Sequence, residues 1–293
     1  MRLDFSPYFQ NTQRVIFNNN GFAPGLGGPD QFVYYYGLLG QMVFDNTTRL
    51  GMNMISGTRF KIRAQYQLAN QFARKEFGEF FADLRTYQPL HKEIILAFRG
   101  TFGTFFGPGA KQYMVGGMDN WLFRGYEVSN EKDDPLKGLN QNNQIISSDE
   151  AQTNWLFNRY VTNLRGFRYN NIYGRSYLLF NAELRVPIIR YFYKGPINSN
   201  FWRNLQLTAF SDAGTAWTGV GPWSAENSLN TKVLNQGNFS VKVKSFENPF
   251  LIGYGFGSRT MVLGYYLKFD MAWGRQNGFT SSPKYYFTLG YDF

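Results

Sequence analysis

The residues whose types and spacing best suggest specific chemistry are the LRGF tetrapeptide at 164–167 and two later acids, Glu183 and Asp212. A guanidinium is a planar, permanently charged fork that binds carboxylates through parallel hydrogen bonds. Both acids lie on the polar side of an alternating segment, so a loop folded onto that side would bring Arg165 against both. The tetrapeptide is therefore interpreted as a latch, with a permissive glycine and an aromatic anchor, made by Leu164, Arg165, Gly166 and Phe167.

The segments that would position these residues have a dominant period of two. In 177–186 (YLLFNAELRV), one side is apolar and the other carries Asn181, Glu183 and Arg185. Such alternation predicts a strand with one apolar and one mostly polar face. Apart from a weak helical pattern at 69–77, the chain predicts ten strands, at 2–10, 32–45, 57–68, 78–88, 93–106, 177–186, 204–217, 250–263, 265–273 and 284–293.

The composition favours a membrane barrel. Aromatic residues make up 19% of the chain, a content typical of barrels with aromatic girdles. Many of the predicted strands are long enough to cross a bilayer when tilted, and no apolar run is long enough for a transmembrane helix. The sequence therefore predicts an all-β transmembrane antiparallel β-barrel of about ten visible strands. It forms one domain over 1–293, with a long lumen-entering or extracellular loop at 107–176 and a further loop at 218–248.

Three motifs in a fixed order resemble one known family. LRGF at 164–167 is followed by a strand with an inward acid (NAELRVPI, Glu183) and then by FSDAGTAW at 210–217. The second strand carries a Phe-x-Asp-x-Gly pattern, formed by Phe210, Asp212 and Gly214. Together with the closing strand, these motifs resemble the BamA-type superfamily of outer-membrane assembly and translocation barrels, known as the bacterial surface antigen domain. The final TLGYDF resembles a C-terminal barrel signal, carried by Thr288, Gly290, Tyr291 and Phe293.

This resemblance implies a location and a function. It implies a multi-pass protein of the outer membrane of a Gram-negative bacterium, in contact with membrane lipids. Its clients would be outer-membrane or secreted polypeptides, or lipids, which a non-enzymatic barrel helps to insert or translocate. Periplasmic N-terminal modules or accessory proteins are the further partners that the family implies. The LRGF loop would lie inside the lumen, held by Glu183 and Asp212 on the barrel wall.

The chain also departs from the family pattern. Family barrels have sixteen strands, so the ten strands here would be the last ten of such a barrel, a shortened barrel, or a barrel whose earlier part is supplied elsewhere. A second tripeptide, RGY at 124–126, competes with RGF at 165–167 as the lumen motif. LRGF is preferred because its distance to the following strands fits better.

An anion-favouring channel or porin-like transporter is the alternative function. Arg59, Lys61 and Arg63 share one face of a predicted strand, which suits a water-filled lumen. Further cations on predicted strands would add to an anion-favouring lining, at Arg85, Arg99 and Lys268.

Other functions receive less support. The single histidine, His91, and the lack of cysteine argue against zinc chemistry and a serine triad, and Ser258 has no obvious partner. The acids Asp133, Asp134, Asp149 and Glu150 match no calcium-loop spacing, so no metal and no cofactor is expected. The net charge of +10 is spread over alternating positions, so nucleic-acid binding is not expected.

Overall fold

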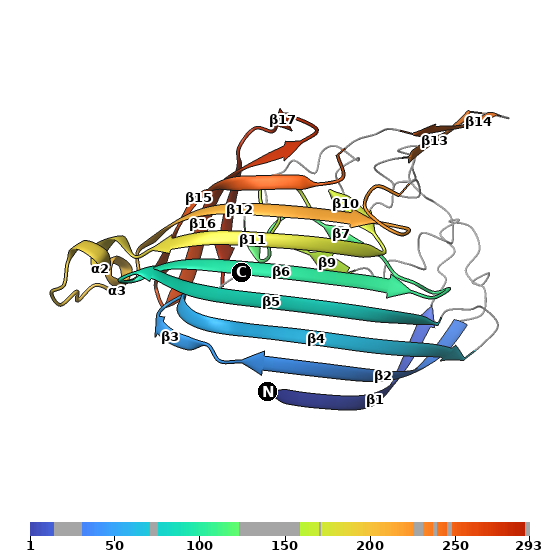
Figure 1. Ribbon diagram of the computed structural model, residues 1–293, viewed down its shortest axis with the longest axis horizontal. Coiled ribbons are helices and arrows are strands. Elements are labelled where there is room, and N and C mark those ends of the chain that lie inside the picture. Colours follow the sequence, from blue (N-terminus) through green and yellow to red (C-terminus); the bar gives the residue numbers. More distant parts are fainter. Residues whose placement is uncertain are drawn as a thin grey trace, which may run out of the picture.

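The protein is described here by a computed structural model, which describes residues 1–14, 31–70, 76–122, 159–169, 171–224, 231–236, 239–244 and 248–290. A single 13-stranded sheet dominates it (Figure 1). Ten of its strands have six residues or more and follow one another along the sheet: β1 (Arg2–Arg14), β2 (Gln31–Asp45), β4 (Met54–Asn70), β5 (Phe77–His91), β6 (Ile94–Phe106), β11 (Ser176–Val186), β12 (Gln206–Trp217), β15 (Leu251–Val262), β16 (Tyr265–Gln276) and β18 (Lys284–Leu289).

Every neighbouring pair in this sheet is antiparallel, and two of the connections at one end are tight turns. The β5–β6 turn contains only Lys92 and Glu93, and the β15–β16 turn contains only Leu263 and Gly264. Lys92 and Leu263 both have positive φ, as tight turns require. The predicted all-β fold, with antiparallel strands near the predicted positions, is confirmed.

The two faces of the sheet have opposite characters. In β11, Asn181, Glu183 and Arg185 are buried on the inner face, whereas Phe180 on the outer face is 51% exposed. Other long strands also expose apolar side chains outward, among them Phe5, Leu38, Leu68, Leu84, Phe98, Leu207, Phe256 and Phe269. A water-soluble sheet packs its apolar face inside, so this sheet has the inverse arrangement.

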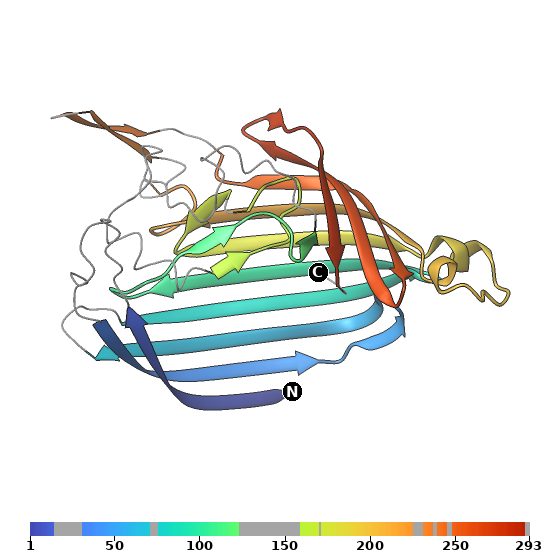
Figure 2. The ribbon, with the colours of Figure 1, turned by 180° about the vertical axis from the view of Figure 1, so that it is seen from behind.

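The long region 107–176 contains short strands. β7 (Tyr113–Val115), β9 (Arg159–Val161) and β10 (Ile172–Gly174) form a small separate sheet. Its buried side chains join one apolar cluster with Tyr177 and Leu179 of β11, so this small sheet lies against the concave side of the main sheet (Figure 2). A fourth strand, β8 (Trp121–Leu122), pairs with β18.

Several expected segments need correction. The loop predicted at 218–248 contains a hairpin, β13 (Thr231–Gln236) with β14 (Phe239–Lys244). The weak helical pattern at 69–77 is not helical where the structure describes it, because residues 69–70 end β4 and Phe77 begins β5. Two short helices that were not predicted, α2 (Ile188–Phe192) and α3 (Asn200–Arg203), connect β11 to β12.

The sheet is not closed into a barrel across the described residues. β1 lies at one edge, where it pairs only with β2, and β18 lies near the other, with β8 outside it. Two minor strands complete the sheet, β3 (Thr48–Gly51) beside β4 and β17 (Phe279–Thr280) beside β16. Among the described residues, no helix has the length and apolar character needed to span a membrane.

Candidate functional site

Arg165 lies at the centre of the inner face and contacts both predicted acids. Its Nε and Nη2 donate to the two carboxylate oxygens of Asp212 at 2.7 and 2.8 Å, and its Nη1 donates to Glu183 Oε2 at 2.9 Å. Its backbone N–H also donates to Asp212, at 3.1 Å. Because Arg165 is only 1% exposed, its charge is stabilised by these carboxylates in place of water.

Each named residue of the Phe-x-Asp-x-Gly pattern contacts the LRGF loop. Phe210, Asp212 and Gly214 alternate along β12 and therefore all face inward. The ring of Phe210 lies under the Arg165 guanidinium, with 3.5 Å between the ring centroid and Cζ. Gly214 leaves room for Leu164, since a Cβ added there would come within 3.2 Å of the leucine side chain. The two-residue spacing of the pattern therefore places three successive inward-facing positions of β12 against the loop.

Glycines allow the loop backbone to lie directly on the sheet. Gly166 has φ +87°, and a Cβ there would come within 2.5 Å of the backbone of β16. On the sheet side, a Cβ at Gly253 would come within 1.9 Å of the Arg165 carbonyl oxygen. Tyr286 of β18 completes this contact, because its hydroxyl accepts from the Gly166 N–H at 2.9 Å and donates to the Phe167 carbonyl at 2.7 Å.

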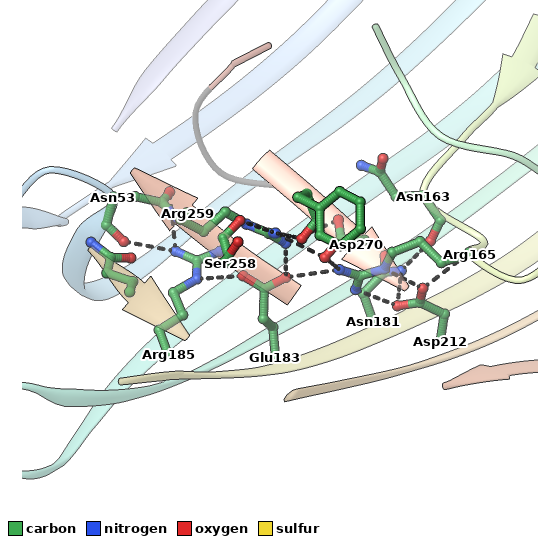
Figure 3. A network of polar contacts seen from close by, with 12 residues as sticks. Asn53, Asn163, Arg165, Asn181, Glu183, Arg185, Asp212, Ser258, Arg259 and Asp270 are labelled. Atoms are coloured by element: carbon green, nitrogen blue, oxygen red, sulfur yellow. Dashed lines mark hydrogen bonds and ion pairs between the residues drawn. The ribbon is translucent and has the colours of Figure 1, made fainter. Parts of the chain in front are cut away.

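The Arg165 pair belongs to a larger ionic network (Figure 3). Glu183 also accepts from Arg185 Nε at 2.9 Å and lies 3.4 Å from Arg259 Nη2. Arg259 in turn forms an ion pair of 2.8 Å with Asp270 of β16. Asn181 donates to Asp212 at 2.8 Å and to the backbone carbonyl of the loop residue Asn163. The network ties four neighbouring strands and one loop together.

Charge within this network is balanced, with three guanidiniums and three carboxylates, all buried: Arg165, Arg185, Arg259, Glu183, Asp212 and Asp270. Burial by itself lowers the pKa of the Arg165 guanidinium, but the neighbouring carboxylates, Asp212 first among them, raise it overall. The arginine therefore remains charged. An arrangement of buried, oppositely charged groups that pair with one another is suited to holding a loop in place.

A glycine pair holds the other side of the loop. Gly116 and Gly117 both have positive φ, and the carbonyl of Gly117 accepts from the N–H groups of Asn163 and Leu164 at 2.9 and 3.0 Å. The side chains of Leu164 and Phe167 are buried in the apolar cluster shared with β11. The LRGF tetrapeptide is thus enclosed between the small sheet and the main sheet.

The terminal strand residues are only partly described. Thr288 is fully buried in β18, and Gly290 has φ +133° and donates its N–H to the Tyr266 carbonyl. Tyr291 and Phe293 lie outside the described residues. So do the competing RGY at 124–126 and the four acids considered for calcium, Asp133, Asp134, Asp149 and Glu150. Elsewhere in the described ranges, no group of three or more potential metal-ligating side chains occurs.

Five of the six cations expected in an anion-favouring lumen line one cavity of about 630 Å³, between the inner face and β9: Arg59, Lys61, Arg63, Arg85 and Arg99. The sixth, Lys268, is buried in β16. His91 lies at the end of β5, 3.2 Å from the Tyr191 hydroxyl, and Ser258 lies in β15, where its carbonyl accepts from Arg259. The channel function and the absence of enzymatic activity stay predictions.

Sequence reasoning missed several members of the site. Asp270 and Arg185 were on the polar faces of predicted strands, so the alternation could have identified them as inward-facing. Arg259 and Tyr286 gave weaker signals, because glycines and aromatics surround them in the sequence. In comparisons with known proteins, no family model matches the chain, and no curated protein matches it either.

Proposed function

We propose that this chain is a non-enzymatic outer-membrane barrel that assists the insertion or translocation of proteins or lipids, with the LRGF loop latched inside its lumen. The observation that carries the proposal is the bidentate contact of Arg165 with Asp212, reinforced by Glu183. A loop from the middle of the chain is bound by buried charges on the inner wall. The motif order that resembles the BamA-type superfamily supplies the link from this contact to assembly.

The outer face supports the membrane part of this proposal. Exposed apolar side chains recur along strand after strand, as in Leu38, Phe98 and Phe256, while the inner face carries charge. A large apolar surface of this kind is costly in water and stable in hydrocarbon. An open edge along β1, and along the part of β18 that β8 does not cover, would be costly in lipid. In a membrane these edges would therefore pair with each other or with further strands.

The proposal is tested by reconstituting the protein in lipid vesicles and adding an unfolded outer-membrane barrel as client. Client insertion, measured as the resistance of the client to external protease, should be faster than in vesicles without the protein. Arg165→Gln should slow it strongly, because this change removes the charge from the latch and leaves the buried Asp212 carboxylate without its arginine. Arg203→Gln, on an exposed residue of α3, is the matched control. Equal rates with and without the protein would refute the function, and a fully active Arg165→Gln would refute the latch.

A further inference from the structure

A second group of charges lies on the inner face, away from the latch. Six cations line the 630 Å³ cavity, and they come from β4, β5, β6 and β9: Arg59, Lys61, Arg63, Arg85, Arg99 and Arg159. The lining contains two carboxylates, Asp45 and Asp83. A third, Glu79, lies beside it and forms ion pairs with Arg63 and Arg159. Among the described residues, the cations of this cavity therefore exceed its carboxylates by three.

The strand register places three of these cations in one row. Arg59 of β4 is directly opposite Arg85 of β5, which is directly opposite Arg99 of β6. Like charges in directly opposite positions destabilise a sheet. Two carboxylates relieve part of this repulsion. Asp83 accepts from Arg85 at 2.8 Å and from Arg99 at 3.1 Å, and Asp45 of β2 lies directly opposite Arg59. A further anion bound beside these three arginines would reduce the repulsion that remains and would therefore stabilise the sheet.

The chemistry of the row indicates which anion fits. Guanidinium groups bind phosphate oxygens in pairs, with a geometry that lysine does not offer. Neighbouring strands lie about 4.8 Å apart, so three arginines on three strands cover about 10 Å, a suitable span for two linked phosphate groups. The cavity is also lined by apolar residues in register with its cations, Val43 of β2 opposite Lys61 and Phe81 of β5 opposite Arg63. We propose that this cavity binds a phosphate-bearing anion of more than one charge, either a soluble one or the headgroup of a lipid.

The first experiment is calorimetric titration of the detergent-solubilised protein with inorganic pyrophosphate at low ionic strength. Binding should be saturable and should weaken with added salt. Arg85→Gln should weaken it about tenfold or more, since this change removes a charge-assisted contact to the anion. Arg99 still neutralises Asp83 in that variant, so the fold is retained, and circular dichroism checks this. Lys61→Gln, which leaves both arginines on Asp83, is the second variant, and Arg203→Gln is the control.

The second experiment distinguishes the source of the phosphate. Native mass spectrometry from mixed micelles should show whether a phosphatidic acid is retained by the wild type and lost in Arg85→Gln. Pyrophosphate binding that the cavity variants weaken supports a soluble ligand, and lipid retention that they abolish supports a headgroup. The proposal is overturned if neither probe binds, or if both bind equally well to the cavity variants and to Arg203→Gln. Because these readouts measure binding alone, they do not depend on the proposed assembly function.

Discussion

Arg165 shows how one buried side chain fixes a loop. Its Nε, Nη1 and Nη2 atoms and its own backbone N–H donate to carboxylates of β11 and β12, and its guanidinium lies over the ring of Phe210. Removing one partner from a buried ion pair costs more than the pair contributes, because the remaining charge is left in a dry environment. The latch is therefore more sensitive to single substitutions than to the joint removal of both partners.

The Tyr286 hydroxyl offers a sharper test than the charges do. In Tyr286→Phe, the Gly166 N–H and the Phe167 carbonyl both lose their partner while the ring remains. The expected loss is about 1–3 kcal/mol in the free energy of unfolding, because two buried backbone groups stay unsatisfied. Equilibrium unfolding by urea in detergent measures it. The neighbouring Tyr285→Phe is the control, since Tyr285 is 54% exposed on the outer face. Equal effects of the two changes would contradict the assigned contact.

Gly253 tests the close approach of the loop backbone. A methyl group in Gly253→Ala would occupy the position of the Arg165 carbonyl, so the loop has to move away from the sheet. We expect a loss of about 1–3 kcal/mol and faster tryptic cleavage of the loop. Gly40→Ala is the matched control, because its Cβ would meet Phe5 at an ordinary 3.5 Å. If the tryptic cleavage of Gly253→Ala matches that of Gly40→Ala, the loop does not lie where the structure places it.

Alternation along the strands determines which side chains lie on the outer face, where the proposed function places lipid. The chain has no cysteine, so single cysteines can be introduced without further changes. In native membranes, Leu38→Cys, Phe98→Cys and Phe256→Cys should react at least tenfold more slowly with a charged maleimide than Val220→Cys does. Val220 is fully exposed in a loop, whereas the other three positions are on the outer apolar face. In denaturant all four should react alike. Fast reaction at the three strand positions in membranes would show that the outer face is in water.

The same alternation explains how much could be predicted from the sequence. It gave the ten long strands, and it put Glu183 and Asp212 on the inner face because side chains alternate with an exact period. It could not give the contacts that depend on packing between distant segments. The small sheet of β7, β9 and β10 was missed because each strand has only three residues, too short for a period to show. Asp270 had the right face, but nothing local indicated its partner Arg259.

At the level of the whole molecule, the edge of the last long strand is already occupied. β8, from the long region between β6 and β11, pairs with β18 through Phe287–Leu122 and Thr288–Trp121. Asn120 adds a hydrogen bond to the Leu289 carbonyl at 3.2 Å. A client strand that added to β18 at these residues would have to displace β8 first.

Locking β8 onto β18 should therefore inhibit the proposed function. Leu122→Cys with Phe287→Cys places two cysteines at directly opposite positions, within the Cα distance that a disulfide spans. Oxidation should stop client insertion in the vesicle assay, and reduction should restore it. The two single variants, oxidised in the same way, are the controls. If insertion proceeds at the normal rate with the cross-link formed, this part of the β18 edge is not used by clients.

The enclosed position of the loop also sets an order of events during folding. Gly166 and Phe167 are bound by Tyr286, a residue 120 and 119 positions later in the chain. A charged arginine cannot be threaded between finished strands, because it would lose its water before it reached its carboxylates. We therefore expect the loop to contact β11 and β12 before β16 and β18 have paired into the sheet. Contacts between residues this far apart in the sequence make folding slow. A chain without β18 would lack the Tyr286 contacts that hold Gly166 and Phe167.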